Sequence, residues 1–573
     1  MPPNTDHWCA LLVESLDDEY EAMILKGAVR GARERDVRIL CVAGGVVDDP
    51  DPERRARNFA FDLVDGRNVD SVIALSSAIG SAIGPAVLKE WLGRYQGLPS
   101  CCLGVQVAGH LHIGVDNYTG TLNLVQHLLE VHGARRLAFI RGPLDSPEAE
   151  DRFRAFRHAL GTSDVEFDQR LVVLGDYTKE SGQRAIAELT NERGVRLDTV
   201  DSIVAANDYM AQGALIELQR QHLRIPEDVQ LVGFDDVDSA RFLRPALTTV
   251  RQPIETLGRK AVDLLHGIIQ GSLPALEILR TEVVIRRSCG CQTVDLGLLS
   301  HDSFRPSPRT GTSLVLPRQR ILAGLERAAR GALEGVEPGW GDRLLDAVAQ
   351  QLEGPTDDTL ALGVDQLLRH WDPESVDGSV MQDVLSVIRR EVLACVGDDH
   401  ASRARLEAAI HEARVAAALG VGEAIESKWK RQAELFDRFE HVAHRAMFQP
   451  SVLLGELLQQ PLAALGVEAC VVAALDRPGD VPGEATVLFA VGAGAPSSGE
   501  TTPLWALPQH QALQHRGHAL ILLPLCADRL PLGAAVLAVS HIDGALLEEL
   551  RAWFGALVRV AALRGNQRFS YYP

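Results

Sequence analysis

The sequence lacks an apolar run long enough to cross a bilayer, since a spanning helix needs about 20 consecutive apolar residues. The opening residues, MPPNTDHWCALLV, have neither the basic start nor the long apolar centre of a secretory signal. We therefore expect a cytoplasmic protein without a membrane partner.

Basic residues are scarce. There are 57 Lys and Arg residues against 77 Asp and Glu residues, which gives a net charge of −20. An extended nucleic-acid-binding surface needs clustered Lys and Arg, and the sequence shows no such segment. The composition argues against a broad nucleic-acid interface, although a small basic domain on an acidic body remains compatible with it.

Catalytic signatures are missing. The sequence has no P-loop, no GxGxxG after a strand, no HExxH, no GxSxG elbow, no GGDEF and no kinase ATP-binding motif. Asp235 and Asp236 are adjacent, so on a strand they would face opposite ways and make a poor acid–base pair. We expect a protein that is not an enzyme and holds no cofactor.

Closely spaced metal ligands are also rare. Several of the nine cysteines lie in apolar runs, which is typical of buried, reduced thiols. Apart from the adjacent Cys101 and Cys102, the only close pair is Cys289 and Cys291. This pair lacks a second CxxC or a histidine partner at zinc spacing, and the 18 histidines show no evident ligand spacing. The sequence therefore predicts no metal site.

What the sequence does contain is an alternation of strands and helices. Its 573 residues suggest roughly three domains. Residues 8–115 alternate continuous apolar runs with helical patterns, which indicates a parallel sheet covered on both faces. Further on, two short apolar runs end in Asn207-Asp208 and in Asp235-Asp236. Open α/β sheets bind ligands at the carboxyl ends of their strands, so these residues are candidates for a binding cleft.

Three motifs in one order carry a family resemblance. AANDYMAQGAL, RIPEDVQLVGFDD and PALTTVRQPIETLGRKAV resemble the ligand-binding core of LacI/GalR-family transcriptional regulators, which is similar to periplasmic sugar-binding proteins. The resemblance extends back through VDNYTGTLNLVQHLLEVHGARRLAFIRGP and covers Trp8 to Arg287. It implies an α/β fold of two lobes, each a doubly wound parallel sheet, with a cleft that closes on a ligand.

The resemblance also implies three crossings between the lobes. The first is expected where the α/β unit from Leu137 onward follows the helix from Thr121 to Val131. The others are expected near Thr248 to Gln252 and near Ser272 to Leu276, with a helix from Pro253 to Ile269 returning to the first lobe.

The resemblance places several polar residues in the cleft. Arg152 occupies the position of an arginine that hydrogen-bonds ligand, and a planar guanidinium suits a sugar diol or a carboxylate. Asn207 and Asp235 would face the ligand, and Gln252 would reach it from the floor of the cleft. Each has a plainer alternative, such as a surface salt bridge for Arg152 or a helix cap for Asn207.

Four more residues complete the predicted site. Asp116 and Asn117 would approach from the other lobe, although a capping role fits them equally well. Tyr177 and Tyr20 offer flat faces for stacking on a sugar ring. Many family members have Asn-Pro and two aromatics after the first strand, whereas this chain has DEYE at residues 18–21. These acids would suit a polyol, an amine or no ligand at all.

The second half of the chain divides by composition and pattern. We predict a ligand-binding sensor domain over residues 1–290 and a linker over 291–318, followed by an all-α signalling region over 319–447. Residues 448–565 contain the hairpin pattern ALILLPLCADRLPLGAAVLAVS before a last helix, which resembles an α+β GAF-type sensory domain. Residues 566–573 would be a tail.

The output of such a sensor is the open question. Family members normally carry a helix-turn-helix before the sensor, but here the first sensor strand begins near residue 8 and leaves no room. Residues Ala413 to Gln432 have the spacing of a helix-turn-helix, with basic residues near the second helix. We favour one long helix instead, because alanine-rich helices produce this pattern by chance.

Two hypotheses follow. The first is a homodimeric regulator of transcription that senses a sugar or a related polar solute, relays closure through the helical region, and acts on DNA directly or through a partner protein. The alternative is the sensory subunit, or truncated sensory half, of a kinase or diguanylate-cyclase signalling system.

Overall fold

The computed structural model describes residues 7–272, 278–291, 317–329, 339–353, 359–369, 378–396, 399–446, 451–479, 481, 483–492, 499–513, 519–540 and 543–565. The chain forms two compact units, which are treated separately below. The first unit combines residues 1–293 with residues 441–573, and the second is residues 294–440.

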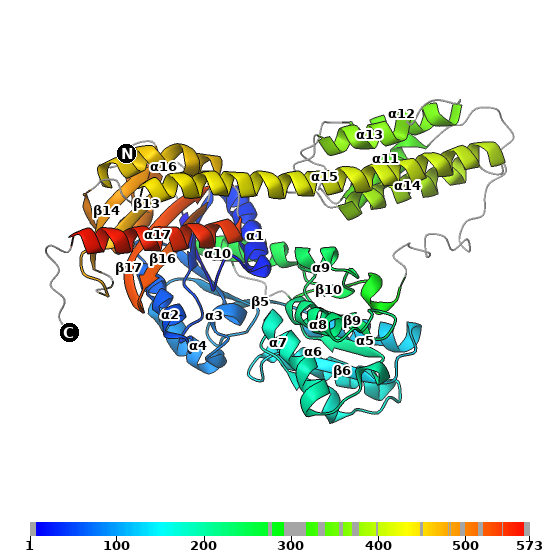
Figure 1. Ribbon diagram of the computed structural model, residues 1–573, viewed down its shortest axis with the longest axis horizontal. Helices are drawn as coiled ribbons and strands as arrows, with labels where there is room; N and C mark the ends of the chain where they lie inside the picture. The colour runs from blue at the N-terminus through cyan, green and yellow to red at the C-terminus, as the bar shows by residue number, and fades with distance from the viewer. Residues whose placement is uncertain are drawn as a thin grey trace. The chain divides into compact units, whose positions relative to one another are not determined.

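The first lobe of the first unit is a parallel sheet with helices on it (Figure 1). Its strands lie in the order β11-β5-β4-β3-β1-β2, and the first three of them in sequence (β1, β2 and β3) are almost wholly buried. This burial on both faces is what continuous apolar runs predict. The elements are β1 His7–Val13, α1 Glu19–Arg35, β2 Val37–Ala43, α2 Pro52–Arg55, the 3₁₀ helix η1 Ala56–Leu63, β3 Ser71–Leu75, α3 Ser76–Ile79, α4 Gly84–Leu92, η2 Gly93–Tyr95, β4 Ser100–Leu103, β5 Leu111–Val115, α10 Ile254–Ile269 and β11 Ile278–Leu279.

The second lobe is a smaller parallel sheet in the order β7-β6-β8-β9. Its core contains the buried rings of Phe139, Phe156 and Phe234. The elements are α5 Asn117–Val131, β6 Leu137–Arg141, α6 Pro147–Thr162, η3 Gln169–Leu171, β7 Val172–Leu174, α7 Lys179–Ala187, η4 Glu188–Glu192, η5 Leu197–Thr199, β8 Ser202–Ala205, α8 Asp208–Arg220, β9 Gln230–Val232, α9 Asp238–Phe242, β10 Thr249–Arg251, β12 Glu282–Val284 and η6 Arg287–Cys289. The two-lobed α/β fold is therefore confirmed.

The chain crosses between the lobes three times. The first crossing is at Asp116, because β5 belongs to the first sheet while α5 packs in the core of the second lobe. The second follows β10, where the chain returns to the first lobe as α10. The third lies after Leu279, since β11 pairs with β5 and β12 pairs with β10. The predicted range for this last crossing, Ser272 to Leu276, was wrong, and its residues 273–276 lie outside the described part of the chain.

Residues 451–565 form the C-terminal part of the first unit. Their elements follow the predicted order of helix, strands, hairpin and closing helix. At the hairpin turn Asp528 and Arg529 both have positive φ values, 50° and 67°, as a two-residue turn of type I′ requires. The elements are α16 Ser451–Ala464, β13 Val467–Leu475, β14 Glu484–Val491, β15 Thr501–Pro503, η9 Leu504–Gln509, η10 Gln511–Leu513, β16 Ala519–Ala527, β17 Leu530–Val539 and α17 Gly544–Gly565.

The C-terminal strands continue the sheet of the first lobe. Strand β16 pairs with β2 in parallel, with Leu520 opposite Leu40, and the combined sheet has 11 strands (Figure 1). Both parts contribute side chains to one core, in which Phe61 and Val42 pack with Leu522. Strand β2 would otherwise expose unpaired backbone groups at the edge of its sheet. The C-terminal strands therefore cover an edge of the sensor lobe.

The described part of the second unit consists mainly of helices. They are α11 Arg318–Ala329, α12 Trp340–Glu353, α13 Thr359–Arg369, α14 Gly378–Val396 and the part of α15 His400–Ala446 that lies before residue 441. Helix α15 runs without a break through Ala413 to Gln432, so the turn of a helix-turn-helix is missing there. Of the predicted linker, residues 292–316 lie outside the described residues, as does the predicted tail. None of the described helices is both long and apolar enough to cross a membrane.

Candidate functional site

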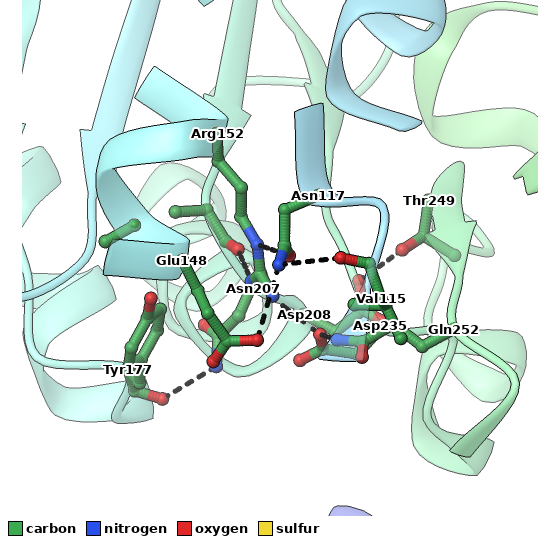
Figure 2. Close-up of polar contacts among 12 residues, drawn as sticks. Val115, Asn117, Glu148, Arg152, Tyr177, Asn207, Asp208, Asp235, Thr249 and Gln252 are labelled. Atoms are coloured by element: carbon green, nitrogen blue, oxygen red, sulfur yellow. Dashed lines mark hydrogen bonds and ion pairs between the residues drawn. The ribbon is translucent and has the colours of Figure 1, made fainter. Parts of the chain in front are cut away.

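Arg152 is at the centre of a buried polar cluster in the second lobe (Figure 2). Helix α6 starts at the cap Ser146 and Pro147, which places Arg152 in its second turn with 4% of its surface exposed. Its Nε donates to Asn117 Oδ1 at 2.8 Å and its Nη1 donates to the carbonyl of Ala206 at 2.5 Å. The guanidinium is thereby locked in one orientation.

Asp235 is the counter-ion of this arginine. Its Oδ1 lies 3.8 Å from Arg152 Nη1 and accepts a hydrogen bond from Gln252 Nε2 at 2.6 Å. The residue has φ 127°, a strained backbone for a residue other than glycine, which is common at binding sites. Burial raises the pKa of the Asp235 carboxyl well above its usual range, and the positive charge of Arg152 opposes this rise.

One acceptor of this cluster is unused. Gln252 is 4% exposed, and within the described part of the chain its Oε1 has no hydrogen-bond partner. A buried acceptor without a donor is unfavourable, so a ligand hydroxyl or N–H that reached it would be bound more tightly. We call Asn117, Glu148, Arg152, Asp235 and Gln252 the Arg152 cluster.

Asn207 and Asp208 hold the start of α8. Asn207 Oδ1 accepts from the amide of Met210 at 2.9 Å, and Asn207 Nδ2 donates to the carbonyl of Tyr177 at 3.0 Å. Asp208 is fully buried and its Oδ1 accepts from the Thr249 hydroxyl at 2.6 Å. The Asn207 side chain thus has the capping geometry, and its role in binding ligand stays a prediction.

Asp116 and Asn117 belong to the second lobe, so their predicted approach from the other lobe was wrong. The chain crosses at Asp116, and α5 of the second lobe begins at Asn117. Asp116 caps this helix by accepting from the Thr119 amide at 2.9 Å. Asn117 joins the Arg152 cluster, since its Nδ2 donates to Glu148 Oε1 at 3.3 Å. Asp236, the neighbour of Asp235, is instead paired with Arg251 at 2.7 Å.

A cavity between the lobes borders the Arg152 cluster at Tyr177. Tyr177 lies on the cavity wall, and the Arg152 guanidinium is 6.0 Å from the centre of its ring. The other residues that line the cavity are Ser76, Ser77, Gly80, Ser81, Gly84, Pro85, Leu88 and Val105 from the first lobe, and Pro143, Asp145 and Ser146 from the second. Tyr177 is the one of the eight predicted site residues that lines the cavity as the described residues define it.

The two lobes also touch directly beside the cluster. The hydroxyl of Tyr209 accepts from the amide of Glu19 at 2.8 Å, and Glu19 Oε2 accepts from the amide of Ser239 at 2.9 Å. Tyr20, on α1, packs against the core of the second lobe. These contacts cross the interface between the two lobes.

Glu14, Asp17 and Asp18, the acidic residues that follow β1, lie close together at the interface between the lobes. Burial, reinforced by the negative charges of Asp18, Asp49 and Asp17, raises the pKa of Glu14 to about 7. Burial likewise raises the pKa of Asp18 to about 6. In the unfolded chain both would titrate near their ordinary values, so the folded protein binds more protons than the unfolded chain between about pH 4.5 and pH 7.

This difference predicts a pH-dependent stability. As the pH rises through this window, wild type loses stability at Glu14, because its carboxylate must ionise in a buried, acidic setting. We expect Glu14→Gln to match wild type near pH 4.5 and to be more stable above pH 7, by about 3 kcal/mol, since the pKa is raised from 4.5 to about 7 and each pKa unit corresponds to about 1.4 kcal/mol. Thermal unfolding from pH 4.5 to 8 measures this difference. The exposed Glu90→Gln should show none, and a gain that is constant with pH would contradict the assignment.

Four metal-ligating side chains also come together, although no histidine partner for Cys289 and Cys291 was predicted from the sequence. His127, His132, Cys289 and Cys291 have donor atoms within 4.8 Å of one another. The sequence reasoning missed them because it sought a histidine near the cysteine pair in sequence, whereas the histidines lie about 160 residues earlier. The missed signal was the pair of histidines near the end of one helix, His127 and His132.

Comparison with known proteins covers the front half of the chain. Residues 125–289 match the family described as periplasmic binding protein-like domain. The chain is 36% identical over 228 residues to the HTH-type transcriptional regulator CelR of Thermobifida fusca, a match that covers 39% of this chain and 64% of that regulator. It is 26% identical over 290 residues to the HTH-type transcriptional repressor CytR of Escherichia coli K12, covering 50% of this chain and 80% of the repressor.

A solved structure of a CelR–cellobiose complex is 30% identical to this chain, with a TM-score of 0.42, and the match covers 49% of this chain and 85% of that one. The family match, like the three motifs, falls within the two-lobed part of the chain.

Proposed function

Since the front half of the chain carries a periplasmic-binding-protein-like ligand-binding domain of the LacI-family type, we propose that the protein is a small-molecule-sensing regulator, with transcription as its output. It binds a sugar-like effector between its lobes and changes their relative position when it does so. The observation that carries this proposal is the buried Arg152 cluster, with its unused acceptor on Gln252, beside a cavity between the lobes.

The chemistry of the cluster indicates what kind of effector fits. Carboxylates and a free amide oxygen outnumber the single guanidinium, so the site offers more acceptors than donors. A neutral polyol or sugar supplies several hydroxyl donors, and its hydroxyl oxygens still accept from Arg152. The face of Tyr177 in the cavity wall supplies a flat apolar surface for a sugar ring. The CelR structure named above holds cellobiose, which supports an effector of this class.

We propose that the movement of the lobes is transmitted through the 11-stranded sheet that the first lobe shares with the C-terminal strands, and through the helices of the second unit. Movement of the first lobe carries strand β2, and β2 is hydrogen-bonded to β16 of the C-terminal part. Residues 451–565, which we propose to be a GAF-like domain, would therefore move with the first lobe as one body. The helical region then passes the change in a homodimer to DNA or to a partner protein.

Replacing Gln252 tests the effector site directly. Gln252→Ala removes the unused acceptor and the donor to Asp235, and we expect it to weaken effector binding about tenfold, as loss of one or two hydrogen bonds does. A thermal-shift screen of cellobiose, ribose, other sugars, polyols and nucleosides identifies the effector, because a ligand of the native state raises the melting temperature. Titration calorimetry then gives the affinities of wild type and variant.

The exposed Gln169→Ala serves as the matched control and should bind as wild type does. Binding of an effector with equal affinity by wild type and Gln252→Ala would contradict the placement of the site. A complete absence of stabilisation across the sugar, polyol and nucleoside panel would contradict the proposed function itself.

A second candidate is the sensory half of a kinase or diguanylate-cyclase system. The fusion of the sensor lobe to further strands and a helical unit favours it, because the matched regulators correspond to only the front half of this chain. A DNA shift assay at several salt concentrations separates the two candidates. Specific binding that an effector abolishes favours the regulator, and absent binding with a co-purifying kinase or cyclase favours the second candidate.

A further inference from the structure

The Cys–His cluster of His127, His132, Cys289 and Cys291 lies in the second lobe. It is at the C-terminal end of α5, whereas Asn117 is at the N-terminal end. His127 is near the end of α5 and His132 caps it, while the cysteines flank Gly290 at the end of η6. Cys289 is fully buried and the other three side chains are partly buried. The four donor atoms thus lie within 4.8 Å of one another in a partly buried position.

The distances between these atoms are those of a tetrahedral metal site. His127 Nε2 lies 3.2 Å from His132 Nε2, 3.5 Å from Cys291 Sγ and 3.7 Å from Cys289 Sγ, and His132 Nε2 lies 3.3 Å from Cys291 Sγ. Bond lengths of about 2.1 Å to nitrogen and about 2.3 Å to sulfur at tetrahedral angles place two nitrogens about 3.3 Å apart and nitrogen and sulfur about 3.6 Å apart.

Hydrogen bonding alone does not account for this arrangement. An imidazole Nε2 carries either one N–H or one lone pair in the plane of the ring, so it makes one good hydrogen bond. His127 Nε2 has three close neighbours, and none of them is a carboxylate or a carbonyl. A single cation at the centre would satisfy all four groups at once.

The surrounding backbone is arranged to present these ligands. Gly290 has φ 97°, a left-handed conformation that turns the chain between the two cysteines and brings their sulfurs to the same side. The hydroxyl of Thr248 lies 3.2 Å from Cys289 Sγ and can donate to a thiolate there. Thr248 can thus orient the Cys289 side chain, as hydrogen-bonding neighbours of the ligands do in metal sites.

We propose that His127, His132, Cys289 and Cys291 bind one Zn²⁺ ion as a structural site. Two thiolates and two imidazoles in a tetrahedron are a typical ligand set for zinc, and four protein ligands leave no position open for a substrate. The proposal does not depend on the effector or on the output of the protein.

The zinc would fix where the chain leaves the sensor domain. Cys291 is the last described residue before the segment that leads to the helical unit, and the ion ties it to α5. The same helix begins with Asn117, which is hydrogen-bonded to Arg152. One rigid helix therefore joins the effector cluster at its start to the metal-fixed exit of the chain at its end.

Metal content and thermal unfolding of the full chain test the proposal. Protein purified without an affinity tag, in a thiol reductant, should contain about one zinc per chain by mass spectrometry. A strong chelator should remove it and lower the melting temperature by more than about 5 °C, since a structural zinc contributes directly to folding, and added Zn²⁺ should restore it. After reloading with Co²⁺, the wild-type protein should show the intense visible absorption of tetrahedral cobalt bound to thiolates.

Variants locate the ion. Cys291→Ser and His132→Ala should lose the zinc and no longer respond to chelator, whereas Cys526→Ser, which changes a partly buried cysteine elsewhere, should keep both properties. If these variants do not fold, the visible spectrum of Co²⁺-loaded wild type tests the proposed metal site instead. Wild type without zinc and unaffected by added Zn²⁺, a disulfide between Cys289 and Cys291, or zinc retained in both variants would overturn the proposal.

Discussion

Arg152→Ala should destabilise the sensor domain by about 3–5 kcal/mol and abolish effector binding, because it leaves the buried Asp235 carboxylate without its counter-ion. It also leaves the carbonyl of Ala206 and the amide oxygen of Asn117 without their donors. Thermal or denaturant unfolding measures the loss of stability, and calorimetry with the effector measures the loss of binding. The neighbouring Arg154→Ala removes an exposed arginine of the same helix and should change stability by less than about 0.5 kcal/mol.

Two further measurements separate charge from packing in this prediction. Adding Asp235→Asn to Arg152→Ala removes the unpaired carboxylate, so the double variant should be more stable than Arg152→Ala alone. The cost of Arg152→Ala should also be smaller at pH 5 than at pH 8. Without the arginine, the folded-state pKa of Asp235 rises further, so the protonated form avoids the penalty at low pH. A cost independent of pH, with no recovery in the double variant, would show that packing dominates.

Gly27→Ala should destabilise the first lobe by about 3 kcal/mol, because α1 and α10 pack backbone against backbone at this glycine. A Cβ built on Gly27 would lie 1.9 Å from the carbonyl oxygen of Glu255, and one built on Gly258 would lie 2.1 Å from that of Ile24. No side-chain rotation relieves such a contact, so the two helices must move apart. The melting temperature of the first unit measures the effect.

Gly161→Ala is the matched control for this prediction. Gly161 is an exposed glycine near the end of α6, and a Cβ there has no atom within 4 Å. Alanine has the higher helix propensity, so we expect unchanged stability or a gain of about 0.5 kcal/mol. If Gly27→Ala were as stable as wild type, α1 and α10 could not pack as closely as described.

Much of the fold could be predicted from the sequence because its signals are local. Continuous apolar runs between helical patterns indicate buried parallel strands, and the three motifs around Asn207, Asp235 and Gln252 indicate the two-lobed domain. The helical character of residues 319–447 and the hairpin in ALILLPLCADRLPLGAAVLAVS were predicted from periodicity and pattern. Arg152 was selected from the family resemblance, which places a ligand-binding arginine at this position.

Other features depend on residues that are far apart in the chain, and no local pattern encodes them. Asn117 became a partner of Arg152 only because the chain crosses to the second lobe one residue earlier. Strand β16 reaches the edge of β2 across nearly 500 residues. The Cys–His cluster joins the end of α5 to the exit of the domain.

Sequence by itself therefore determined which elements form and which lobe architecture they build, because periodicity and capping act over a few residues. Only the tertiary structure decided which polar groups meet, which sheet edge is covered and where four metal ligands converge, because these contacts arise when distant segments are packed against one another.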